Sequence, residues 1–142
     1  GKYGFLDIIE NYEGTTAAKL ATYSAGMSYL NIKDYENAIT YLDQFYSEDV
    51  LLGALAKGSI GDAFAQMNQP EKALEYYIAA SNINNNVYST PKFLYKAAII
   101  GSKLGKNKQA LAYLERIKKE FKESHEAKMV SVQIAKIKSI ID

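Results

Sequence analysis

Apolar side chains recur at steps of three and four residues along most of the chain, and short polar turns interrupt them at regular intervals. Such spacing gathers the apolar side chains on one face of a helix. The last segment shows it most clearly, with Ala127, Val130, Ile134, Ile137 and Ile141 in one stripe. The pattern predicts an all-α chain of helices and short turns, without strands.

Three segments of this helical pattern repeat one another. Each holds an Ala, a large apolar residue directly after it, and a Tyr three positions after it, and the three anchors are Ala38, Ala73 and Ala110. A second small residue stands twelve positions before each anchor: Gly26, Gly61 and Ala98. A small residue lets a neighbouring helix approach closely, and neither helix can bury its apolar face alone. The sequence therefore predicts helix pairs that stack on one another.

We expect one domain over residues 1–142, built from three full helix pairs between two flanking helices. The predicted parts are a leading helix over 3–14, pairs over 16–46, 48–83 and 90–122, and a capping helix over 124–142. Residues 8–19 align with 117–128, so we expect the leading helix to be the second helix of a pair whose first helix is missing. Thr15 or Thr16, Asp34 and Ser47 are suitable N-caps for three of the helices.

The order of small, aromatic and Ala positions over residues 20–122 resembles the tetratricopeptide repeat. The resemblance implies an α-α superhelix that acts as a non-enzymatic scaffold and binds a segment of a partner protein in its concave groove. Some tetratricopeptide domains hold a partner's C-terminal carboxylate, and Lys92 and Lys96 match two of the positions used. Tyr23, Met27 and Ser59 occupy the other three, so we do not predict binding of that kind.

The links between repeats, such as Tyr12 to Lys19 and Phe121 to Lys128, are similar to those of bacterial cell-envelope repeat proteins. The similarity is greatest to ancillary translocon subunits. It implies a role in protein translocation or assembly at the envelope and a periplasmic location, tethered by an N-terminal membrane helix that is not in this chain. A cytoplasmic location is the alternative.

Repeat alignment places a mixed set of side chains on the concave faces of the three first helices. We expect this groove to bind the partner, with Asp62 and Lys103 setting its direction through opposite charges. The alternative is that the flanking helices fill the groove. The predicted groove residues are Tyr23, Met27, Leu30, Asp62, Gln66, Tyr95, Ile99 and Lys103.

Composition excludes several classes of chemistry. The chain has 142 residues with no Cys and one His, which removes disulfides, thiolate sites and most His-ligated metal sites. Gly101 to Lys106 lacks the spacing of a phosphate loop, and His125 has only its chain neighbours beside it, which cannot form a catalytic triad. We therefore expect no catalytic residues, no metal and no cofactor.

Charge is divided unevenly along the chain. Residues 1–91 hold five lysines and eleven acidic residues, whereas residues 92–142 hold twelve basic and five acidic residues. The basic part mixes lysines with glutamates in helical segments, which is typical of a solvated face, so we expect no nucleic acid partner. The asymmetry leaves one alternative function open, a homo-oligomer that joins the acidic first repeats to the basic last repeat of a neighbour.

Overall fold

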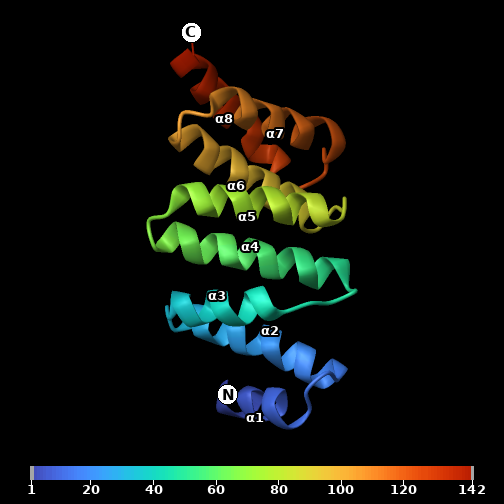
Figure 1. The fold of residues 1–142 in the computed structure, drawn as a ribbon. Helices are drawn as coiled ribbons and strands as arrows, with labels where there is room; N and C mark the ends of the chain where they lie inside the picture. Colours follow the sequence, from blue (N-terminus) through green and yellow to red (C-terminus); the bar gives the residue numbers. More distant parts are fainter. Residues whose placement is uncertain (1, 142) are drawn as a thin grey trace.

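The computed structural model describes residues 2–141, which form eight α-helices and no strand. The helices stack from the N-terminal to the C-terminal end, and the two termini lie at opposite ends of the stack (Figure 1). The all-α superhelix expected from the sequence is therefore confirmed. The helices are α1 (Lys2–Asn11), α2 (Thr16–Asn31), α3 (Tyr35–Gln44), α4 (Val50–Gln66), α5 (Pro70–Ile83), α6 (Thr90–Lys103), α7 (Asn107–Glu120) and α8 (Ala127–Ile141).

The turn within each helix pair follows one rule. The first helices α2, α4 and α6 each end beside a residue in the left-handed region, which is Lys33 (φ 64°), Asn68 (φ 57°) or Gly105 (φ 78°). The next residue donates its backbone N–H to a carbonyl five residues earlier, at 2.9 Å in the first two turns and 2.8 Å in the third. This bond satisfies a carbonyl at the helix end and sends the chain back antiparallel.

The starts of the helices agree with the sequence in two cases and differ in a third. Thr15 and Asp34 accept hydrogen bonds from the backbone N–H groups of Ala18 and Asn37, as expected of N-caps. The N-cap of α4 is Asp49, not Ser47, because its carboxylate accepts from two N–H groups of the first turn. Ser47 instead accepts a bond from the Asp49 N–H and orders the turn that precedes the helix.

The predicted small residues lie where the paired helices meet. A Cβ on Gly26 would stand 2.6 Å from the Leu42 side chain, and one on Gly61 would stand 2.7 Å from the Tyr77 ring. Real Cβ atoms do not approach so closely, so both glycines are required for the packing. In the third pair, Ala98 and Ala110 are fully buried.

Two hydrophobic clusters form the core. The first is built on α3 to α6, the second on α6 to α8, and the neighbouring residues Phe93 and Leu94 belong one to each. Val130, Ile134 and Ile137 of α8 are buried in the second cluster. The buried part of the expected stripe ends there: Ile141 is 45% exposed and, with residues of the polar α6–α7 turn, lines the edge of a hollow.

Within residues 2–141, no helix is both long enough and apolar enough to cross a membrane.

Candidate peptide-binding groove

A polar hollow of about 580 Å³ lies between the first helices of the three pairs. It contains three of the predicted groove residues, Leu30, Asp62 and Gln66, and these come from α2 and α4. The other lining residues are Asn31, Lys33, Tyr35, Ala65, Tyr77 and Lys96. Five successive helices, α2 to α6, and the turn between α2 and α3 therefore contribute residues to this hollow.

Asp62 is the centre of a hydrogen-bonded network in this hollow. Its Oδ1 accepts from the Tyr77 hydroxyl at 2.6 Å and from the Lys96 ammonium at 2.7 Å. Burial raises the pKa of Tyr77 well above its ordinary value, and the hydrogen bond and charge of Asp62 raise it further. Tyr77 therefore stays a neutral donor, and the network joins α4, α5 and α6.

The cation that faces Asp62 is Lys96, at 2.7 Å, whereas the sequence led us to expect Asp62 and Lys103 to set the partner's direction as opposite charges. Lys96 follows Asp62 by 34 residues, which is one repeat, so the two side chains meet across neighbouring first helices. Lys103 lies about two turns further along α6, is exposed, and lines neither this hollow nor the next one described.

A smaller apolar hollow of about 270 Å³ continues the groove along α6. It is lined by Tyr77, Tyr95, Lys96, Ile99 and Ile100, so it brings together the predicted residues Tyr95 and Ile99. Tyr77 and Lys96 line both hollows. A polar and an apolar compartment thus share one wall.

Two predicted groove residues, Tyr23 and Met27, line neither hollow and pack on the first hydrophobic cluster. The Tyr23 ring lies 5.2 Å from that of Phe45, measured between ring centres, and burial raises the pKa of Tyr23. Phe45 at the end of α3 therefore covers part of what the sequence suggested as open groove. Among the described residues, those lining the two hollows include none from the flanking helices α1 and α8.

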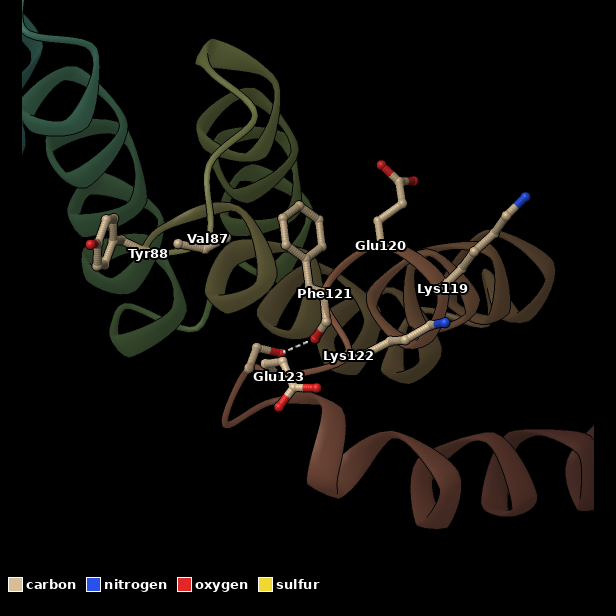
Figure 2. Close-up of a pocket in the computed structure, with 8 residues that line it drawn as sticks. Val87, Tyr88, Lys119, Glu120, Phe121, Lys122 and Glu123 are labelled. Carbon is tan, nitrogen blue, oxygen red and sulfur yellow. Dashed lines mark hydrogen bonds between the residues drawn. The ribbon is translucent and has the colours of Figure 1, made fainter.

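A larger hollow of about 630 Å³ lies outside the groove, at the edge formed by the loops between repeats. Figure 2 shows the α5–α6 loop, with Val87 and Tyr88, facing the end of α7 at Phe121. Ser124 donates a hydrogen bond of 2.7 Å to the Phe121 carbonyl and holds the turn that follows α7. The remaining lining residues are two lysines and two glutamates, so this hollow carries no charge preference: Lys119, Glu120, Lys122 and Glu123.

Sequence reasoning missed several residues that line the groove, among them Tyr77, Lys33 and Asn31. Tyr77 directly follows the Tyr of the second repeat's pattern, which explains its packing but does not indicate that its hydroxyl reaches Asp62. Lys33 and Asn31 lie at the α2–α3 turn, and neither was considered. The spacing of one repeat between Asp62 and Lys96 was an available signal for their ion pair.

The fold and the groove define a helical-repeat solenoid with a recessed concave face. No group of three or more His, Asp or Glu residues within the described chain is placed to hold a metal ion. One tetratricopeptide repeat family model matches residues 21–49 and 54–87, and a second such model matches residues 93–124. The chain belongs to the tetratricopeptide repeat family, whose members generally mediate protein–protein interactions and are typically not enzymes. No curated protein matches the chain.

Proposed function

We propose that this protein is an interaction scaffold that holds a segment of a partner protein in the groove across α2, α4 and α6. The observation that supports this most is the pair of hollows that meet at Tyr77 and Lys96. An apolar side chain of the partner fits between Tyr95 and Ile99, and polar groups reach Asn31 and Gln66. Apolar anchors in such pockets supply most of the affinity, and neighbouring polar contacts set register.

The affinity of one such groove is modest, because three helix pairs offer a small contact area. The aromatic and apolar lining favours an extended or helical segment that contacts successive first helices in series.

We place this activity in protein translocation or assembly at a bacterial cell envelope, on the periplasmic side. The support is the similarity of the inter-repeat links to those of ancillary translocon subunits. In this setting a membrane helix outside residues 1–142 tethers the domain, and the groove receives a segment of an envelope complex.

The test is site-specific photo-crosslinking with a reactive residue at position 99, followed by mass spectrometry of the captured protein. A matched probe at position 132 on the exposed side of α8 serves as control. We expect crosslinks from position 99 only, and about a tenfold loss of capture in a Tyr95→Ala, Ile99→Ala variant. Because Tyr95 also contacts the second cluster, Ile99→Asp alone is the second variant. If both variants capture the partner as well as the wild-type protein does, the groove is not the binding site.

Self-association is the second candidate function. The observation that favours it is that the acidic and basic parts of the chain lie toward opposite ends of the stack (Figure 1). End-to-end contact of opposite charges weakens with salt. Sedimentation velocity at low and at high salt separates the two candidates: a salt-sensitive oligomer supports self-association, and a monomer in both conditions leaves the groove as the functional site.

A further inference from the structure

Lysines outnumber acidic residues around the groove. Lys33 lines the polar hollow, and Lys96 lines both hollows. Lys92 lies one turn before Lys96 on α6, and its ammonium stands 5.5 Å from the centre of the Phe93 ring. That ring stacks on Tyr77, a wall of the groove. Lys103 is one turn beyond Ile99 on the same helix, so α6 presents a row of cations along the groove.

Among the described residues, one acidic side chain lines the polar hollow, none lines the apolar hollow, and that one is already paired. Asp62 forms an ion pair with Lys96. Within residues 2–141, Lys33, Lys92 and Lys103 form no ion pair, and all three are exposed. Lys33 lines the polar hollow, whereas Lys92 and Lys103 line neither hollow and lie on α6 one turn before Lys96 and one turn after Ile99. The three charged residues that line the two hollows, Lys33, Lys96 and Asp62, carry a net charge of +1, although residues 1–91 hold more acids than lysines.

We propose that the groove selects an acidic segment, with carboxylates that approach Lys33, Lys92 and Lys103 and an apolar side chain that enters the Tyr95–Ile99 hollow. This inference rests on the proposed function and specifies the chemistry of the partner. The cations increase the association rate and exclude basic segments, since like charges facing each other across an interface are repulsive.

Internal carboxylates, not a free C-terminus, are the feature that the groove recognises. Tyr23 and Met27 on α2 and Ser59 on α4 carry no positive charge, and the first two pack on the hydrophobic core. These three positions therefore offer a terminal carboxylate no cation. Amidation of the peptide C-terminus should therefore leave binding unchanged.

Selection from a random peptide display library tests the proposal directly. The targets are the wild-type protein, a Lys33→Gln, Lys92→Gln, Lys103→Gln variant and a matched Lys118→Gln, Lys128→Gln, Lys136→Gln variant. The matched variant loses the same charge from exposed positions of α7 and α8. Circular dichroism checks that all three proteins are folded.

We expect peptides selected on the wild type to contain Asp and Glu about threefold more often than the library does. In fluorescence anisotropy, an amidated selected peptide should bind the groove-lysine variant about tenfold more weakly and the matched variant within about twofold of wild type. Replacing the Asp and Glu residues of the peptide with Asn or Gln should weaken its binding to the wild-type protein by a similar factor.

The result that overturns the proposal is selection of neutral or basic peptides, or an equal loss in both lysine variants. The Ile99→Asp variant separates this failure from failure of the groove itself. If selected peptides lack acids but lose binding to Ile99→Asp, the groove function stands and the acidic preference is wrong. If Ile99→Asp binds them as well as wild type does, or no peptide is selected, both proposals fail.

Discussion

Gly53 and Gly58 both lie inside α4, but their surroundings differ. A Cβ on Gly58 would overlap the Phe93 ring, whereas a Cβ on Gly53 would meet no atom within 4 Å. Phe93 is 1% exposed and stacks on Tyr77, so its ring has no room to move away. The packing of the Phe93 ring from α6 against α4 therefore depends on Gly58.

We expect Gly58→Ala to lower the free energy of unfolding by about 1–3 kcal/mol, because the added methyl overpacks the core. Gly53→Ala is the control on the same helix, and it should raise stability by about 0.5–1 kcal/mol, since Ala loses less backbone entropy. Urea denaturation measures both. Equal effects of the two changes would contradict the packing argument.

Tyr77 gives the protein a dependence on high pH. Burial, the hydrogen bond to Asp62 and its charge raise the Tyr77 pKa above the ordinary 10.0. A group whose pKa is higher in the folded state stabilises the fold fully below pH 10, and this stabilisation is lost as the pH rises further. We expect the free energy of unfolding to fall above pH 10 less steeply in Tyr77→Phe than in wild type. Parallel pH profiles would show that Tyr77 is not the cause.

Helices and their pairing could be predicted from the sequence because both depend on local patterns. Steps of three and four residues define the buried face, and Gly26 and Gly61 mark the contact within a pair. The same spacing predicted the buried face of the capping helix correctly as far as Ile137. Ile141 continues the periodicity, but periodicity does not show where the neighbouring helix ends.

The groove was only partly predictable, because the pattern gives the face of each helix but not which turns meet across the groove. Lys96 and Lys103 share a face of α6, and only the packing angle of the helices decides that Lys96 reaches Asp62. Lys33 joins the site through the left-handed turn that ends α2. Phe45 covers Tyr23 because the chain leaves α3 in that direction.

The capping helix has a buried and an exposed isoleucine three residues apart. Ile137 is 2% exposed and lies in the second cluster, whereas Ile140 is 67% exposed. We expect Ile137→Ala to cost about 2–5 kcal/mol, from lost transfer free energy and the cavity left behind. Ile140→Ala should change stability by less than about 0.5 kcal/mol. Thermal unfolding compares them, and similar melting points would mean that α8 does not close the core as described.

At the scale of the whole molecule, stability is distributed along a line of helix pairs. Each helix packs mainly on its neighbours in the chain, and the two clusters meet at α6 and at Tyr113 of α7, which packs against both. Such an arrangement couples distant repeats through intermediate ones. The centre of the stack is therefore more strongly supported than its ends.

The N-terminal end has the weakest support. None of the α1 side chains described, at positions 4–11, is fully buried, whereas α4 buries eight residues. Local opening costs least where few apolar contacts are lost. We expect backbone amides of α1 to exchange with deuterium about tenfold faster or more than those of α4 and α5. Hydrogen exchange with mass spectrometry measures this gradient.

Leu114→Ala, a change in the second cluster, should speed exchange in α7 and α8 more than in α3. Uniform protection along the chain, or an equal response of α3 and α8, would mean that the solenoid unfolds as one unit.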